Sequence, residues 1–212
     1  MPLINEKTSW KSYFNIRKIN VVIRLLTFVD LIVIGGFGLI APIFAVYITD
    51  TIKGGTVEVV GIASGIYLIS KAISQIPVGI IVDKIPGEKD DFWFMFAGHM
   101  LFSIAPLFYI VISTPLQLYI FQFFYGLVVA LAAPTWCAIF TRHIDKNYEG
   151  IEWASYTTLT ELGAAGTAFL GGLLAYRFGF NVLFILVSIA SFVGSIFLLG
   201  IYRKMRPGKV LF

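Results

Sequence analysis

Charged residues and cysteine are scarce in this chain of 212 residues. Only 13% of the residues are Asp, Glu, Lys or Arg, whereas 58% are hydrophobic, and the sequence contains two His and one Cys. The single cysteine, Cys137, excludes an intrachain disulfide and is expected to be a small packing residue in an apolar stretch. So much apolar surface cannot be buried inside so short a chain, and lipid has to cover part of it. The sequence therefore predicts an integral membrane protein.

Several motifs of enzyme chemistry are also missing. The sequence has no G-x-x-x-x-G-K-[ST] phosphate loop, no H-E-x-x-H helix and no G-x-S-x-G turn. The basic residues give a net charge of +4, but they form no run with interleaved exposed aromatics. We therefore expect no enzyme, no cofactor, no metal site and no nucleic-acid partner.

Six apolar stretches are each long enough to cross a bilayer. An α-helix rises ~1.5 Å per residue and the hydrocarbon core is ~30 Å thick, so about 20 apolar residues make one span. We expect a bundle of six transmembrane helices over 21–203, preceded by a cytoplasmic segment, 1–20, and followed by a cytoplasmic tail, 204–212. The predicted spans are 21–48, 58–83, 92–113, 117–141, 153–176 and 181–202.

Lys and Arg gather on one side of these spans. Most of them flank the starts of the odd-numbered spans and the ends of the even-numbered spans, whereas only Lys53 and Arg177 lie on the opposite side. By the positive-inside rule both termini are cytoplasmic, which requires an even number of spans. The sequence predicts a multi-pass protein of the cell membrane, surrounded by the lipid bilayer.

The first three predicted spans resemble the last three. At an offset of about 92 residues, the segment 39–44 is similar to 131–136, and Ala63-Ser64 matches Ala154-Ser155. A unit of three helices repeated once enters the membrane in opposite orientations, which defines a 3+3 inverted repeat. Chance matching in a sequence rich in Leu, Ala and Gly is the alternative.

Four segments resemble the major facilitator superfamily of transporters. The segment 79–87 resembles the G-x-x-x-D-[RK]-x-G loop of that family, and together the four match the amino-terminal half of its usual twelve helices. The departures are Pro86, an extra residue in the loop, Gln122, where Arg is common, and Thr167-Ala168, which replaces a Gly-Pro pair of antiporters. The other three segments are 41–47, 122–126 and 171–180.

The resemblance implies one bundle of a transporter whose pathway lies between two six-helix bundles. The second bundle is then a second copy of the chain in a parallel twofold dimer, or an unlike partner, or the missing half of a longer carrier. The implied function is secondary transport of a small polar solute by alternating access, either as proton-coupled symport or as facilitated diffusion. The alternatives are a non-transporting membrane assembly module, a fragment of a twelve-helix carrier, and a channel.

Ionisable side chains at membrane depth are costly unless they are solvated or paired, so each is a candidate functional residue. We expect Asp30, Lys71, His99 and Glu161 to lie near one common layer. Asp30 is the candidate proton acceptor or ligand of a cationic substrate. Lys71 is a better partner for it than Arg24, which is six residues away at poor helical spacing. His99 is expected to be structural or interfacial, or a proton relay.

Two helix faces predict the wall of a cavity. In the resembled family the first and fourth helices line the pathway, so Phe37, Gln122, Tyr125 and Trp136 are candidate substrate contacts. Ordinary packing is the alternative for Phe37 and Trp136. Helical spacing gives Asp30, Phe37, Ala41 and Phe44 on one face, and Gln122, Tyr125, Val129 and Trp136 on the other.

The second and fifth helices face the other bundle in the resembled family. In a twofold dimer Lys71 of one copy would then lie near Glu161 of its mate, as a static ion pair or as a proton or substrate site. Gly79, Asp83 and Lys84 would form a conformational lock, with Asp83 at the amino end of the partner's fifth helix in the outward-open state. An ordinary solvated loop charge is the alternative for Asp83.

Overall fold

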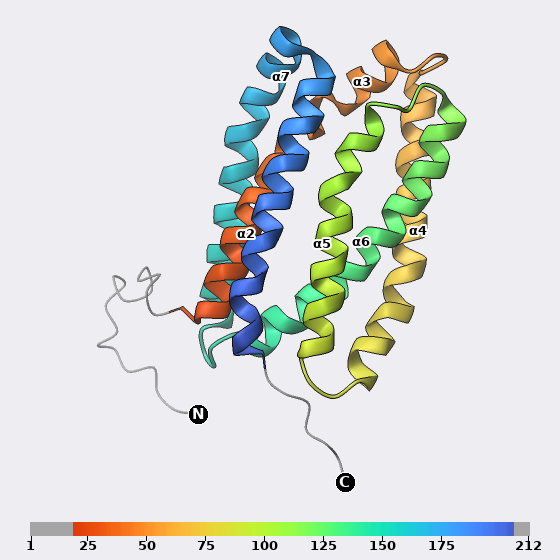
Figure 1. Cartoon of the computed structure of the whole chain (residues 1–212). Coiled ribbons are helices and arrows are strands. Elements are labelled where there is room, and N and C mark those ends of the chain that lie inside the picture. The colour runs from red at the N-terminus through yellow and green to blue at the C-terminus, as the bar shows by residue number, and fades with distance from the viewer. Residues whose placement is uncertain (1–18, 206–212) are drawn as a thin grey trace.

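The computed structural model describes residues 19–205, which form helices joined by short turns (Figure 1). No strand occurs in this range, so the predicted all-α fold is confirmed. Most of the predicted amino-terminal segment, 1–20, and of the tail, 204–212, lies outside the described residues. In chain order the helices are α2 (Val21–Gly38), η2 (Ala41–Ile43), α3 (Phe44–Thr51), α4 (Val57–Lys84), α5 (Lys89–Tyr109), α6 (Pro115–His143), α7 (Glu149–Ile196) and η3 (Phe197–Lys204).

Five helical runs within 19–205 are long and apolar enough to cross a membrane. The last run, Glu149–Lys204, covers both the fifth and the sixth predicted span. Gly179 inside it has φ 81° and ψ 165°, a conformation that glycine adopts readily, and two helices meet there. In Figure 1 the two parts of α7 run side by side in opposite directions. The chain after Gly179 therefore returns to the end of the bundle where α7 starts.

Two predicted spans differ in detail from the structure. The first span, 21–48, lies within one apolar run, Val21–Thr51, but the helix is interrupted there, because α2 ends at Gly38 and Pro42 lies in the 3-10 turn η2 that leads into α3. Proline has no amide hydrogen and its ring clashes with the preceding helical turn. The third span begins at Lys89 instead of 92, because two acidic residues in its first turn favour a helix start there.

The bundle is built from two helix pairs and a connecting helix. α2 packs along α7, α4 packs along α6, and α5 packs against both α6 and α7 (Figure 1). Glycine sets the spacing within each pair. A Cβ atom on Gly171 of α7 would overlap the backbone of Leu39, and one on Gly126 of α6 would overlap Ser70 of α4. Small residues of this kind let membrane helices approach closely.

The buried side chains form two clusters along the bundle. One lies between the start of α2, the start of α5, the end of α6 and η3, and includes Leu26, Phe92 and Phe140. The other lies near α3 and the end of α5, and includes Tyr47 and Phe184. The ring of Phe37 packs against both clusters. The region around Phe37 is thus the middle of the bundle.

Replacing Gly171 by Ala is expected to lower the free energy of unfolding by about 1–3 kcal/mol, because the added methyl group overlaps the Leu39 backbone. Thermal unfolding in lipid nanodiscs measures the effect. Gly172→Ala is the matched control, since no atom lies within 4 Å of the equivalent position there. Equal losses in the two variants would contradict a backbone contact between α2 and α7.

Candidate functional site

A cavity of about 300 Å³ lies at the level of η2, between α2, α4, α5 and α6. We call it the aromatic cavity. The structure brings Phe37, Gln122 and Tyr125, three candidate site residues from distant parts of the sequence, to this one space. Its lining residues are Phe37, Ile40, Ala41, Phe44, Ser64, Tyr67, Tyr109, Gln122 and Tyr125.

Gln122 is the most buried polar side chain of the aromatic cavity. It is 4% exposed, and its Nε2 donates to the hydroxyl oxygen of Tyr109 at 3.4 Å. Its amide oxygen is buried and has no hydrogen-bond partner among residues 19–205. An unsatisfied buried acceptor costs ~1–3 kcal/mol, so a donor group on a bound solute would be favoured here. Tyr109, at the end of α5, was not predicted to belong to this site.

Aromatic rings connect the helices around this cavity. Phe37 of α2 contacts Phe102 of α5 at a centroid distance of 4.1 Å, and Phe102 contacts Tyr125 of α6 at 5.6 Å. Tyr125 in turn stacks on Tyr67 of α4 at 5.3 Å. The Nζ atom of Lys71 lies 6.0 Å from the Tyr67 ring centroid, within the range of a cation–π contact. Lys71 is therefore linked to the cavity wall through one tyrosine.

Asp30 lies in the interior, away from the aromatic cavity. It is 6% exposed, its Oδ2 accepts a hydrogen bond of 3.0 Å from the Tyr156 hydroxyl, and its Oδ1 lies 3.7 Å from Nε2 of His99. The expected pairing with Lys71 is wrong: no ion pair joins them in the described part of the chain. The reason is the helix pairing, because α2 packs on α7, whereas α4, which carries Lys71, packs on α6.

The remaining candidate residues lie elsewhere. Lys71 is half-buried and Glu161 is exposed, and they are not in contact within this bundle. Trp136 is 8% exposed and belongs to the packed core, where its ring lies 4.8 Å from that of Phe140 and 4.9 Å from that of Tyr156. Trp136 does not line the aromatic cavity.

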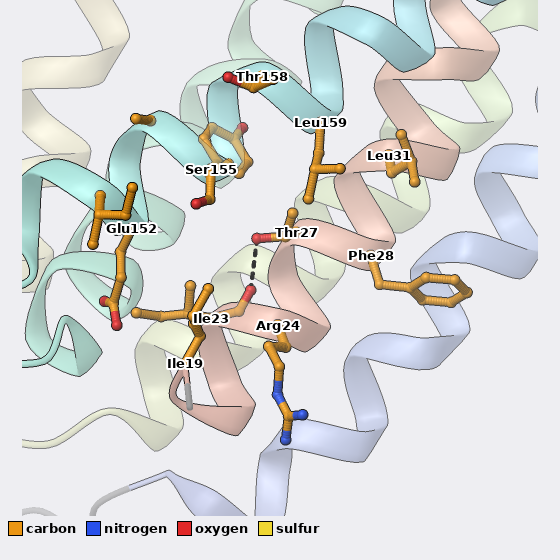
Figure 2. A pocket seen from close by; sticks show the side chains of 13 residues that line it. Ile19, Ile23, Arg24, Thr27, Phe28, Leu31, Glu152, Ser155, Thr158 and Leu159 are labelled. Atoms are coloured by element: carbon orange, nitrogen blue, oxygen red, sulfur yellow. Dashed lines mark hydrogen bonds between the residues drawn. The ribbon is translucent and has the colours of Figure 1, made fainter. Parts of the chain in front are cut away.

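A second cavity, of about 390 Å³, lies between the start of α2 and the start of α7 (Figure 2). We call it the α2–α7 cavity. Its wall is mostly apolar, with Arg24 and Glu152 among the side chains drawn there and Thr27 donating to the Ile23 carbonyl at 2.8 Å. Tyr156, the hydrogen-bond partner of Asp30, also lines it. One side chain thus joins this cavity to the buried carboxylate.

An ionic cluster lies where α5 starts and α6 ends. Arg142 donates to the fully buried carboxylate of Asp91 and, at 3.3 Å, to the carbonyl oxygen of Gly87. Nε2 of His143 lies 3.7 Å from Oε2 of Glu88, which is 2% exposed. This cluster was not predicted. The sequence could have indicated it, because Asp91 at the start of one span and Arg142 at the end of the next carry opposite charges.

The predicted lock residues lie at the same end of the bundle as this cluster. Gly79 is half-buried in α4, and Asp83 and Lys84 are exposed at its carboxyl end. The ionic contacts described above involve the next turn of chain instead. The role of Gly79, Asp83 and Lys84 remains a prediction.

Five long apolar helical runs within 19–205 are typical of a multi-pass membrane protein. Residues 26–211 match the sequence profile of the Major Facilitator Superfamily, and the chain belongs to this family. The predicted resemblance is confirmed. Members of this family are membrane transporters.

Two relatives show how much of the family architecture is present. The chain is 29% identical over 185 residues to an uncharacterized MFS-type transporter of Methanocaldococcus jannaschii, a match that covers 87% of this chain and 45% of that protein. The crystal structure of the POT family transporter PepTSo matches with a TM-score of 0.66 and 14% identity over 88% of this chain and 38% of that one. The chain spans less than half the length of these relatives.

Arg142→Ala is expected to lower the free energy of unfolding by about 3–5 kcal/mol, because it leaves the carboxylate of Asp91 buried without its cation. Adding Asp91→Asn removes that charge and should restore part of the loss. Chemical or thermal unfolding in detergent gives both values, with the exposed Lys146→Ala as control. Additive losses in the double variant would speak against direct coupling.

Proposed function

We propose that this chain is one six-helix bundle of a secondary transporter, that two copies form a parallel twofold dimer, and that the dimer moves a small polar solute by alternating access. The observation that carries the proposal is the position of Glu161. It is exposed on the outer surface of α7 at expected membrane depth. An exposed charge facing lipid is costly, and a second bundle offers it a polar partner.

The helix arrangement supports six spans and an inverted repeat. Two helices meet at Gly179, which divides α7 into a fifth and a sixth span. The first part of α7 packs on α2, with Ala164 and Thr167 beside Gly38, while α4 packs on α6. In an inverted repeat of three helices, span one corresponds to span four and span two corresponds to span five. A contact between spans one and five then corresponds to a contact between spans four and two. The pairs α2–α7 and α4–α6 are consistent with this correspondence.

The membrane orientation follows from the same arrangement. The start of α2 and the end of η3 lie at one end of the bundle (Figure 1). Lys84, Lys89, Arg142 and Lys204 belong to helix ends at this side. We assign this end to the cytoplasmic face of the cell membrane, since Lys and Arg favour that side.

The exposed surface of α4 supports a partner bundle. Only 11% of the most apolar stretch of α4 is buried inside the bundle, the lowest share among the five apolar runs of 19–205. One large face of this helix is therefore left for a neighbour. A second copy supplies both the neighbour and the opposite wall of the pathway. Asp83, exposed at the end of α4, would then be available to the start of the partner's α7.

The aromatic cavity supports a small polar solute as cargo. Its volume of about 300 Å³ lies at the lower end of the range for small-molecule sites, ~300–1,000 Å³. Gln122 offers a buried acceptor, and Lys71 lies close to the wall through Tyr67. A solute with a hydrogen-bond donor and a delocalised or anionic group suits these side chains. Asp30 is the candidate acceptor for a coupling proton, and we propose that this proton and the solute move in the same direction, as in a symporter.

A transport assay on the reconstituted chain tests this function. Proteoliposomes loaded with a panel of radiolabelled amino acids, sugars and organic ions are expected to show counterflow of at least one solute, with accumulation driven by a pH gradient. Asp30→Asn keeps the shape and removes the charge, so it should abolish that accumulation while exchange continues. Full pH dependence in the Asn variant would reject Asp30 as the proton acceptor.

The absence of counterflow with every solute would favour the assembly module or the carrier fragment.

The dimer is tested through the native cysteine. Cys137 is exposed and is the only cysteine of the sequence, so a nitroxide label on it reports a distance between two copies. Wild-type protein diluted in lipid is expected to give one intermolecular dipolar distance. Lys71→Glu or Glu161→Lys alone places like charges across the interface and should weaken the signal, and the double swap should restore it. Arg177→Glu, at an exposed site, is the control.

A signal that is missing in the wild type, or that the single swaps leave unchanged, would contradict a Lys71–Glu161 contact between copies.

A further inference from the structure

The ring of His99 has a hydrogen-bond partner at one nitrogen atom and a carboxylate within ion-pair distance at the other. Nδ1 lies 2.9 Å from the backbone carbonyl oxygen of Met95, one turn earlier on α5, and Nε2 lies 3.7 Å from Oδ1 of Asp30. A carbonyl oxygen only accepts hydrogen bonds, so Nδ1 carries a hydrogen atom. A neutral imidazole with its hydrogen on Nδ1 has a lone pair on Nε2. Nε2 lies near Asp30, whose ionised carboxylate also only accepts hydrogen bonds.

This geometry favours one more proton at the pair. With the proton on Nε2, the imidazolium of His99 and the carboxylate of Asp30 form an ion pair at 3.7 Å. With the proton on Oδ1, a neutral carboxyl group faces the neutral ring. With neither, two lone pairs face each other at a site where the residues are 6% and 8% exposed and water screens little. The favoured state therefore holds one proton between the two residues.

We propose that Asp30 and His99 together form the proton-binding site of this transporter, with the coupling proton carried by either Oδ1 or Nε2. This inference rests on the proposed transport function and adds a second residue to the proton acceptor. The proton comes from water, is held by the pair in one stage of the cycle and returns to water in another. No other reactant is needed.

The other groups around the pair are compatible with this role. Tyr156 of α7 donates its hydroxyl hydrogen to Oδ2 of Asp30. Lys71 of α4 forms no ion pair with Asp30 within 19–205. His99 is thus the only basic side chain within ion-pair distance of Asp30 in this range.

Tyr156 offers a path for the proton. It lines the α2–α7 cavity shown in Figure 2 and bonds directly to the carboxylate. In this structure the Tyr156 hydroxyl donates to Oδ2. For a proton on Oδ2 to leave by this route, the hydroxyl turns, accepts that proton and releases its own hydrogen to a water molecule, so the phenol is unchanged after the transfer. The α2–α7 cavity is then the side on which the proton is exchanged with water.

The second histidine provides a matched control. His143 has the same local geometry, with Nδ1 2.9 Å from the carbonyl oxygen of Ile139 and Nε2 3.7 Å from Glu88. It lies at the end of α6, in the ionic cluster with Arg142. Since the sequence has only these two histidines, His143→Asn leaves His99 as the single reporter.

Nitrogen NMR of ¹⁵N-histidine-labelled His143→Asn protein in nanodiscs, combined with infrared spectroscopy, measures the proton at neutral pH. We expect either a doubly protonated His99 ring, or a singly protonated ring together with the infrared band of a protonated carboxyl group. Either signal should disappear in Asp30→Asn. A singly protonated ring without a protonated carboxyl band would overturn the proposal.

Transport separates this proposal from the proposed function. His99→Gln keeps an amide donor toward Asp30 but cannot titrate, so the pH dependence of uptake is expected to be lost, whereas His143→Gln should retain it. The Cys137 dipolar signal reports whether each variant still folds and assembles. Full pH dependence in a folded His99→Gln variant would overturn the proton site and leave the transport function standing. Absence of transport in the wild type would reject the transport function, while the spectroscopic result would still decide the proton occupancy.

Discussion

The burial of one carboxylate, that of Asp30, governs the interior of this bundle. A charge removed from water in a membrane needs partners that replace its hydration. Asp30 finds them on two other helices, Tyr156 on α7 and His99 on α5. The contact with Tyr156 depends on α2 lying close to α7, which the glycines at their crossing allow. The close approach of α2 and α7 thus permits the hydrogen bond that stabilises the buried carboxylate of Asp30.

The spans were predictable because the signal for them is local. Twenty apolar residues in a row identify a membrane helix without knowledge of its neighbours, and α4 and α6 lie within two residues of the predicted bounds. The faces of the first and fourth helices were also predictable from spacing, and the resemblance to the family implied that Phe37, Gln122 and Tyr125 line one cavity. The apolar signal did not predict the short 3-10 turn at Pro42, which interrupts the helix within an otherwise apolar run.

Pairings between helices were not predictable in the same way. The partner of Asp30 depends on which helix packs beside α2, and depth along the membrane normal does not decide that. Lys71 has the right depth and the wrong neighbour, because α4 packs on α6. Asp91 and Arg142 are 51 residues apart in the sequence, and only the meeting of α5 and α6 makes them a pair. Contacts of this kind follow from where small residues permit close approach.

The contact between Gly171 and the backbone of Leu39 has a mechanical consequence. Two helices held apart by side chains slide by changing rotamers, but a contact between backbones has no rotamer to change. α2 and the first part of α7 are therefore expected to move as one stiff lever, carrying Asp30 and Tyr156 with them. A rocking motion of the bundle is then expected to change the contacts between α5 and this helix pair, and His99 of α5 lies at one of these contacts, beside Asp30.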